Sequence, residues 1–314
     1  MRGADMERAL PTPAESADAA AVTEIIRAVE SSLYGRTTFS EADLVGEWAE
    51  LALERDARVV RDGGRVVGYG VVGERGERWE VEAYVHPDAA GRGIGRLIAA
   101  ALEEEAARDG ARRIQNSVLE ADSAARRLLE SLGYGSVRVF REMRIELEAQ
   151  PPAPEWPAGL RVVPFDPDRD AHEFHAAQQE AFADHWDYSP RDFEPWSKGH
   201  LEGDRFDPTL WCVVRAGNEI AAGTICTGDT YGGGFVHALF TRRPWRRQGV
   251  GAALLGDAFG RFWERGERSV GLGVDTANDT GAFRLYERAG MTPALGWVVY
   301  EKHLSATRAG SPAA

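Results

Sequence analysis

Hydrophobic positions recur with two periods along this chain, and the change from one period to the other marks strands and helices. Between residues 15 and 53 apolar residues recur at helical spacing around a break near 34–40. The following apolar runs alternate as strands do, and the turn residues Asp62, Gly63 and Gly64 join the first pair into a hairpin. In order, the pattern predicts two helices, a hairpin at 57–74, a strand at 78–87, a helix at 89–110, a strand at 114–120, a helix ending at Gly133 and a strand pair at 137–147.

The same order of elements then returns. Residues 149–159, AQPPAPEWPAG, carry four prolines and predict a linker. After it come a strand at 160–165, helices across 168–204, a hairpin at 210–228, strands at 235–240 and 269–274 separated by a helix, and a last helix ended by Gly290. We therefore expect an internal repeat: a flexible tail at 1–14, a domain at 15–148, the linker at 149–159, a second domain at 160–305 and a tail at 306–314.

Composition narrows the class of protein. The chain has 314 residues, enough for two domains of about 150 residues each. Its net charge of −13 argues against nucleic-acid binding, which needs clustered Lys and Arg. It has no apolar run long enough to span a membrane and no signal-peptide core at its start, so we expect a cytoplasmic protein without membrane contact. Cys212 and Cys226 are too few for a disulfide scaffold or a cysteine metal site, and we expect no metal.

The most informative stretch is 235–255, FVHALFTRRPWRRQGVGAALL, which predicts a strand, a basic turn and a helix. Its turn spells R-x-x-G-x-G with Arg246, Arg247, Gln248, Gly249, Val250 and Gly251. The first N–H groups of a helix lack internal partners, so this turn suits a pyrophosphate. A P-loop is excluded because Ala252 follows Gly251, and a dinucleotide fingerprint is excluded because its third glycine would fall at Leu254.

A second motif follows in the expected order. The pattern N…A-x-x-L-Y-x-x-x-G-M is formed by Asn278, Ala282, Leu285, Tyr286, Gly290 and Met291. With these two motifs the chain resembles the GNAT superfamily of acetyl-CoA-dependent N-acetyltransferases. The resemblance implies an α/β fold of two tandem GNAT-type domains. Each would be a mixed, mostly antiparallel sheet flanked by helices, whose fourth and fifth strands splay apart to hold the coenzyme.

The resemblance also implies the coenzyme contacts. The loop from Arg246 to Gly251 would hold the pyrophosphate, and the pantetheine would lie along the strand at 237–240. A main-chain N–H of Leu239 or Phe240 would face the thioester carbonyl as an oxyanion donor. Asn278 would cap the last helix and could also touch the coenzyme.

Two residues are the candidates for proton transfer in the second domain. The resemblance makes Tyr286 the proton donor to the leaving thiolate, because its ordinary pKa of about 10 keeps it protonated at neutral pH. His237 is the candidate general base, although strand alternation leaves open whether its ring faces the core. Asp229, Asp275 and a water chain are the alternatives.

The two copies are not equivalent. The first keeps Gly91, Gly93 and Gly95 as a candidate second coenzyme site, but Ala90 stands where the motif has Arg246. Leu129 stands where the second copy has Tyr286, and leucine cannot donate a proton. We therefore expect a degenerate first domain and a catalytic second domain.

The acceptor pocket is expected to come from the helices and loop that lie between the first two strands of the second domain in the sequence. The candidate residues, which pair aromatic walls with carboxylates, are Phe182, Asp184, Trp186, Tyr188 and Trp196. An equally good interpretation is a helical pair that buries its aromatic residues and exposes its acids.

These features predict acetyl transfer from acetyl-CoA to a primary amine of a small molecule, such as an antibiotic, a natural-product intermediate or a metabolite. The layout also resembles the mycothiol synthase family, which acetylates a cysteinyl amine, but the glutamate which that family carries near the start of the fourth strand is Gly234 here. A non-catalytic acyl-CoA-binding sensor is the alternative of another class, and the retained Tyr286 argues against it. Aminoacyl transfer from charged tRNA is disfavoured by the negative net charge of the chain.

Overall fold

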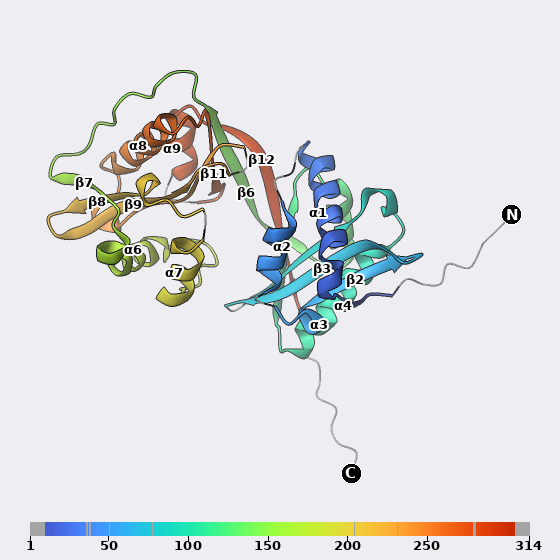
Figure 1. Cartoon of the computed structure of the whole chain (residues 1–314). Coiled ribbons are helices and arrows are strands. Elements are labelled where there is room, and N and C mark those ends of the chain that lie inside the picture. The colour runs from blue at the N-terminus through green and yellow to red at the C-terminus, as the bar shows by residue number, and fades with distance from the viewer. Residues whose placement is uncertain are drawn as a thin grey trace, which may run out of the picture. The chain divides into compact units, whose positions relative to one another are not determined.

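The computed structural model describes residues 10–304 except 36, 38, 50, 77, 204, 231, 279 and 280. The chain forms two compact units (Figure 1). The first unit comprises the described residues up to Arg138 together with those from Trp297 onward, and the second unit is Val139–Gly296. Both are mixed α/β structures, as the sequence predicts. In the described residues, no helix combines the length and the apolar character that crossing a membrane would require.

The first unit is a sheet with helices on both faces. Its helices are α1 (Ala19–Tyr34), α2 (Glu41–Trp48), α3 (Leu53–Asp56), α4 (Ile94–Arg108) and α5 (Ser123–Ser131). Its strands, in sheet order, are β1 (Thr12–Pro13), β2 (Ala57–Asp62), β3 (Arg65–Arg75), β4 (Arg78–Val85), β5 (Arg113–Leu119) and the later part of β12 (Thr292–His303). The pair β4 and β5 is parallel and the other pairs are antiparallel. Tyr69 of β3 packs in the core beneath α1, whereas a Cβ on the next residue, Gly70, would meet Ile98 of α4, so α1 and α4 cover opposite faces.

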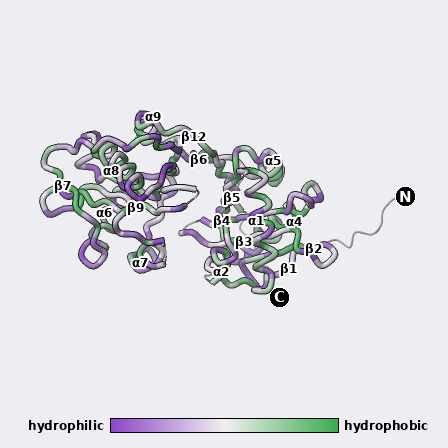
Figure 2. Tube along the Cα trace, turned by 45° about the horizontal axis from the view of Figure 1, so that its top comes forward, coloured by the Kyte–Doolittle hydropathy of each residue, from purple (hydrophilic) through white to green (hydrophobic). Residues whose placement is uncertain are grey.

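The second unit repeats this plan. Its helices are α6 (Pro167–Phe182), α7 (Phe193–Leu201), α8 (Val250–Glu264) and α9 (Ala282–Arg288). Its strands, in sheet order, are β6 (Gly135–Glu146, from Val139 onward), β11 (Ser269–Asp275), β10 (Gly234–Thr241), β9 (Glu219–Thr227), β8 (Cys212–Ala216) and β7 (Leu160–Pro164). Among the strand pairs formed by the described residues of this unit, β10 with β11 is parallel and the others are antiparallel. In Figure 2 the hydrophobic colour gathers along strands and helices, and the hydrophilic colour marks many of the connecting loops.

The last strand of each sequence repeat completes the sheet of the other unit. β6 pairs with β11 from Phe140↔Asp275 to Glu146↔Ser269, and β12 pairs with β5 from Trp297↔Leu119 to His303↔Arg113. The boundaries expected at 148 and 160 place β6 in the first domain and β12 in the second, so the units differ from that expectation at these strands. Side-chain alternation is the same whichever neighbour a strand pairs with, so the pattern predicts the strand and leaves its partner open.

Two further details correct the sequence expectations. The predicted strand pair at 137–147 is a single strand, β6. Part of the expected flexible tail is ordered, because Thr12 and Pro13 pair with Val59 and Arg58 of β2 and Ala14 is buried. The tail expected at 306–314 lies outside the described residues.

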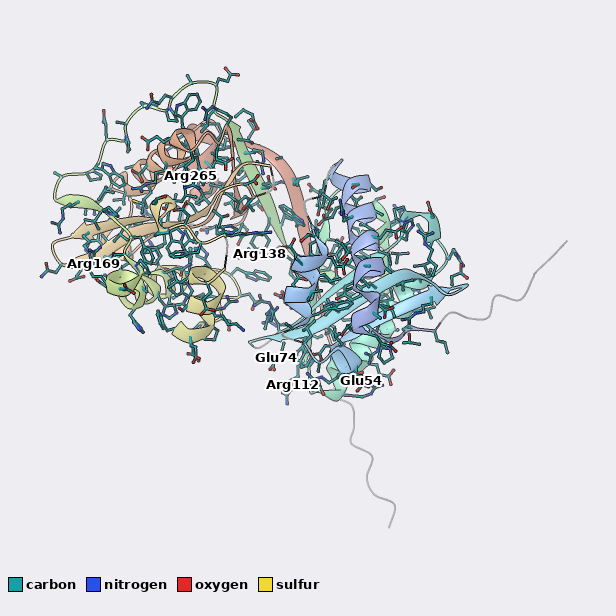
Figure 3. The ribbon with its side chains drawn as sticks, viewed as in Figure 1. Glu54, Glu74, Arg112, Arg138, Arg169 and Arg265 are labelled. Carbon is teal, nitrogen blue, oxygen red and sulfur yellow. The ribbon has the colours of Figure 1, made fainter. Side chains whose placement is uncertain are left out.

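Helix α6, which carries the predicted acceptor segment, is fixed to the sheet at its first turn. Asp170 is fully buried there and accepts hydrogen bonds from Arg215 of β8 at 2.9 Å and from Arg169 at 2.7 Å. Arg169 is labelled in Figure 3. A buried carboxylate is stable when it is paired and hydrogen-bonded, so this contact sets where α6 begins.

Candidate active site

The glycine-rich loop of the second unit forms an amide cradle at the start of α8. Gly249 precedes the helix with a φ of 88°, and Arg247 also has a positive φ, 61°. The first helical donors are the N–H groups of Ala252 and Ala253, which both bond to the carbonyl of Gly249 at 3.1 Å. From Arg247 to Gly251, no main-chain N–H has a protein acceptor among the described residues. These amides lie at the positive end of a helix dipole and fit a pyrophosphate.

The second glycine of the motif has a packing role. A Cβ on Gly251 would lie 3.1 Å from a methyl group of Leu285 in α9, which is tighter than ordinary contact. The missing side chain therefore lets the first turn of α8 approach α9 closely. The helix that carries Tyr286 is thus packed directly against the cradle.

Arg246, predicted to contact the coenzyme, uses its side chain within the protein. It donates to the carbonyl of Thr241 at 3.0 Å, to the carbonyl of Ala181 at 2.8 Å and to Asp184 at 3.0 Å. Asp184 also pairs with Arg243, and hydrogen bonds from Arg243 and Arg246 lower the pKa of the carboxyl to about 2. Asp184, predicted to line the acceptor pocket, instead ties the end of α6 to the loop.

Strands β10 and β11 separate, as the GNAT resemblance implies. Their parallel pairing covers only Gly234–Val236 against Val270–Leu272. On its other edge β10 pairs with β9, and the N–H of Arg242 donates to Ala221 at 2.9 Å. Hydrogen-bonded pairs alternate in an antiparallel ladder, so the N–H of Phe240 faces β9 and that of Leu239 faces the open edge. The geometry therefore favours Leu239 over Phe240 as the oxyanion donor.

His237 is the extra residue of a β-bulge. The pairing of β10 with β9 shifts register between Val236 and Ala238. A bulge re-aims side chains, and the ring of His237 lies at the surface, with Nε2 2.8 Å from Oγ1 of Thr227 and the ring centroid 4.9 Å from that of Phe235. Neighbouring groups displace part of its hydration, and this, with His200 and Arg205 nearby, lowers the pKa of His237 to about 4. Because of this lowered pKa the ring is neutral at pH 7. Its exposed position shows that it does not enter the core.

Tyr286 lies in α9 with 7% of its surface exposed. Burial raises the pKa of its phenol to about 12, so it keeps its proton across the physiological range. In the part of the chain that the structure describes, its hydroxyl has no hydrogen-bond partner. The residue is buried but its hydroxyl oxygen is not fully enclosed, so the O–H is available to an incoming acceptor.

Asn278 does not cap the last helix, contrary to the sequence prediction. Helix α9 begins at Ala282, and its N-cap is Gly281 with a φ of 79°. The N–H of Asn278 donates to the carbonyl of Asp275 at 3.2 Å, which closes a turn after β11. Asp279, the other residue of the predicted cap cluster, lies outside the described residues.

The remaining acceptor candidates divide into surface and core. Phe182, Trp186 and Tyr188 are half-buried at the end of α6 and in the loop after it. Trp186 approaches Phe140 of β6, with ring centroids 6.4 Å apart. Trp196 is 1% exposed and donates through Nε1 to Gln178 at 2.7 Å, so it belongs to the core. The alternative interpretation, a buried aromatic, is correct for Trp196.

Strand β6 adds a face that the sequence analysis assigned to the other domain. Phe140 and Glu142 stand opposite Asp275 and Gly273 of β11, on the sheet face that Trp186 approaches. No sequence signal connects these residues to the site, because the pairing partner of β6 is not encoded in its alternation.

The first unit has the cradle without the rest of the site. Gly93 precedes α4 with a φ of 83°, Gly91 has a φ of 75°, and β4 pairs with β5 only over Trp79–Val81. No register shift interrupts β4 and β3. Leu129, at the position of Tyr286, is 4% exposed. Within the described residues of both units, no cluster of His, Cys, Asp or Glu could hold a metal ion.

An amide cradle at a helix start, beside two splayed parallel strands and a tyrosine, is the arrangement that the GNAT resemblance implies for a coenzyme A-dependent acyltransferase. The chain belongs to the acetyltransferase (GNAT) family, whose model matches residues 21–134 and 171–291. It is 34% identical over 255 residues to a mycothiol acetyltransferase of Thermobispora bispora, covering 77% of this chain and 81% of that one. It is 30% identical to a mycothiol acetyltransferase of Geodermatophilus obscurus, covering 88% and 92%. A solved GCN5-related N-acetyltransferase from Sphaerobacter thermophilus matches with a TM-score of 0.80 and 32% identity, covering 94% and 95%.

These findings confirm the predicted fold class and activity. The protein is an acyltransferase built from two tandem GNAT domains, and it transfers an acetyl group to an amine. The family uses acetyl-CoA as the acetyl donor.

Proposed function

We propose that the second unit alone carries out the transfer, from acetyl-CoA to the primary amine of a small molecule. The observation that carries this proposal is the difference between the units. Both have the glycine cradle, but only the second adds the bulge at His237 and a tyrosine, Tyr286, whose hydroxyl has no protein partner in the described residues. A unit that only held a coenzyme would need neither.

The amides from Arg247 to Gly251 would hold the pyrophosphate of the coenzyme, with Gln248 and Val250 contributing main-chain groups only. The open edge of β10 would receive the pantetheine. The N–H of Leu239 would stabilise the oxyanion that develops on the thioester carbonyl, an effect worth roughly 3 kcal/mol in other acyl transfers. Asn278 stays a candidate contact to the coenzyme from the turn after β11.

The chemistry needs two proton transfers. The amine nitrogen forms a bond to the acetyl carbon while the carbon–sulfur bond breaks. His237, neutral at pH 7, would take the amine proton directly or through water, and Tyr286 would give its proton to the departing thiolate. Asp229 stays an alternative base; it lies in the turn after β9, where its main-chain N–H donates to Glu267 at 2.8 Å.

A cysteinyl amine of the mycothiol type is the second candidate acceptor, because the two relatives above are named mycothiol acetyltransferases. One feature separates this chain from the pattern that the resemblance implies. A Cβ on Gly234 would lie 2.3 Å from the ring of Phe262, so a glutamate has no room at that position. We therefore keep the broader class of small primary amines as the acceptor.

The test is release of free thiol from acetyl-CoA by the wild type and by Tyr286→Phe, against a panel of primary amines that includes glucosamine, n-butylamine and L-cysteine amide. We expect amine-dependent release by the wild type and a strong loss of kcat in the variant. Tight acetyl-CoA binding without release for any amine would favour the sensor alternative instead.

A further inference from the structure

Gly273 of β11 has no structural reason to be glycine. Its φ lies outside the left-handed region, and a Cβ built on it would meet nothing within 4 Å. Its neighbour Gly271 differs, because a Cβ there would lie 2.9 Å from Arg144 and 3.1 Å from Phe235. Glycine inside a strand weakens it, and it often marks a place where a ligand approaches the backbone closely. The space above Gly273 is therefore a candidate ligand seat.

The pairing of the strands shows what borders this space. On one side Gly273 stands opposite Glu142 of β6. On the other side the parallel pairing of β10 ends at Val236↔Leu272, and the next residue of β10 is His237. Met143 and Leu272 are in the core, so Glu142 and Gly273 point to the opposite face. His237 lies on that face too, beside Phe235, whose partner in β11 is Gly271.

One carboxylate oxygen of Glu142 accepts a hydrogen bond from the protein, and the other has no protein donor in the described residues. Its side chain is 6% exposed, and Oε1 accepts from Nε of Arg144 at 2.8 Å. No donor in the described residues reaches its Oε2. Arg144 is itself held by Ser269 at 3.0 Å, so the carboxylate is fixed in place. Oε2 has no protein partner in the described residues and is not fully buried, so it is open to a ligand, and an ammonium group can donate a charge-assisted hydrogen bond to it.

We propose that the space above Gly273 is the acceptor subsite, in which Oε2 of Glu142 receives the primary ammonium group of the acceptor beside His237. The proposal rests on the function proposed above and names the group that recognises its substrate. Phe140 and Trp186 lie on the same face and form an apolar wall for the carbon skeleton. Glu142 is a recognition residue here: the bound ammonium group loses one proton to water before attack, and the nitrogen gives up the second to His237 or water as the amide forms.

The pairing of β6 with β11 gives the proposed subsite its recognition residue. The recognition residue comes from β6, which precedes the linker in sequence, and the reacting groups come from β10 and α9. A second half of the chain that begins at 160 would have the cradle and Tyr286 but would lack Glu142.

The test uses the full chain and the amine of the panel above that gives the fastest thiol release. At saturating acetyl-CoA, Glu142→Gln should raise the KM for this amine by about tenfold or more, because a charge-assisted hydrogen bond becomes a neutral one. Gly273→Val should abolish amine-dependent release by filling the seat, and valine suits a strand, so the sheet should persist. Both variants should bind acetyl-CoA in calorimetry as the wild type does.

Two controls make the result specific. Glu146→Gln changes a carboxylate on the same face of β6 that is bonded instead to Ser269 at 2.6 Å, and it should leave the KM unchanged. Asp275→Asn changes the other carboxylate near the subsite.

The inference is overturned if Glu142→Gln keeps the wild-type KM, if Gly273→Val still turns over the amine, or if Asp275→Asn alone raises the KM. The proposed function still stands in these cases if the wild type releases thiol and Gly249→Val loses acetyl-CoA binding. Those two results therefore distinguish failure of the inference from failure of the proposed function. A wild type that acetylates no amine of the panel contradicts both.

Discussion

Asp184 and Arg246 form an ion pair at 3.0 Å that joins the segment after α6 to the glycine-rich loop before α8. The same guanidinium bonds to the carbonyls of Thr241 and Ala181, so one side chain fastens the loop, the end of β10 and the end of α6 together. The sequence predicted that Asp184 and Arg246 contact two different substrates. In the structure they contact each other, and they position the surfaces that we propose bind those substrates.

Asp184→Asn should weaken acetyl-CoA binding by about twofold to fivefold, because the pair is partly exposed and surface pairs contribute little. Calorimetric titration measures the change. Glu180→Gln is the matched control, since it removes a partner of Arg242 near the end of α6 and leaves the contacts of Arg246 intact. The carboxyl pKa is lowered to about 2, so the pair is present above the ordinary aspartate range and is lost only as the pH falls toward 2. An affinity that changes between about pH 5 and 8 in the wild type and is flat in Asp184→Asn contradicts this role.

Tyr286→Phe should lower kcat by about 100-fold while the acetyl-CoA dissociation constant stays the same. The variant removes the proton donor and keeps the ring that packs in α9. Because the pKa of Tyr286 is raised to about 12, the wild-type rate should not fall up to about pH 10 through loss of this proton. Steady-state kinetics with titration of the coenzyme test both statements, and an unchanged kcat would remove Tyr286 from the mechanism.

His237→Gln should lower kcat at every pH and remove its acid limb. The folded pKa of about 4 lies below the ordinary histidine value, so His237 is neutral and able to accept a proton until the pH falls through about 4. The wild-type kcat should therefore be level from about pH 8 to 5 and fall below that. Thr227→Val is the control for positioning, because Thr227 holds the ring of His237. An acid limb that persists in His237→Gln would point to Asp275 or to water.

Trp196 and Trp186 should respond differently to truncation. Trp196→Ala should cost about 3–5 kcal/mol of unfolding free energy, since it empties a buried site and leaves Gln178 without its donor. Trp186→Ala should change stability little and raise the KM for the amine. Urea unfolding and thiol-release kinetics give the two values. If Trp196→Ala raised the KM for the amine with little loss of stability, and Trp186→Ala lowered the stability instead, Trp196 would belong to the acceptor site.

The sequence predicted the features of the candidate site that depend on local chain geometry, and the roles of these residues stay predictions. A glycine at the start of a helix and a tyrosine at a fixed motif position locate Gly249 and Tyr286 without any long-range contact. The bulge was not predictable, because the register shift that exposes His237 depends on how β10 pairs with β9. Glu142 was missed for the same reason, since its strand looks the same whichever sheet it joins.

The most direct measurement is calorimetric titration of acetyl-CoA into Gly249→Val and its counterpart in the first unit, Gly93→Val, with thiol release measured on both. The two glycines have φ values of 88° and 83°, and neither would bring a Cβ within 4 Å of another group, so both substitutions strain the loop without a clash.

The account predicts that Gly249→Val loses coenzyme binding in the second unit and all amine-dependent release, while Gly93→Val keeps wild-type release whether or not the first unit binds coenzyme. Release that survives in Gly249→Val and disappears in Gly93→Val would contradict the account, because it would place the chemistry in the first unit.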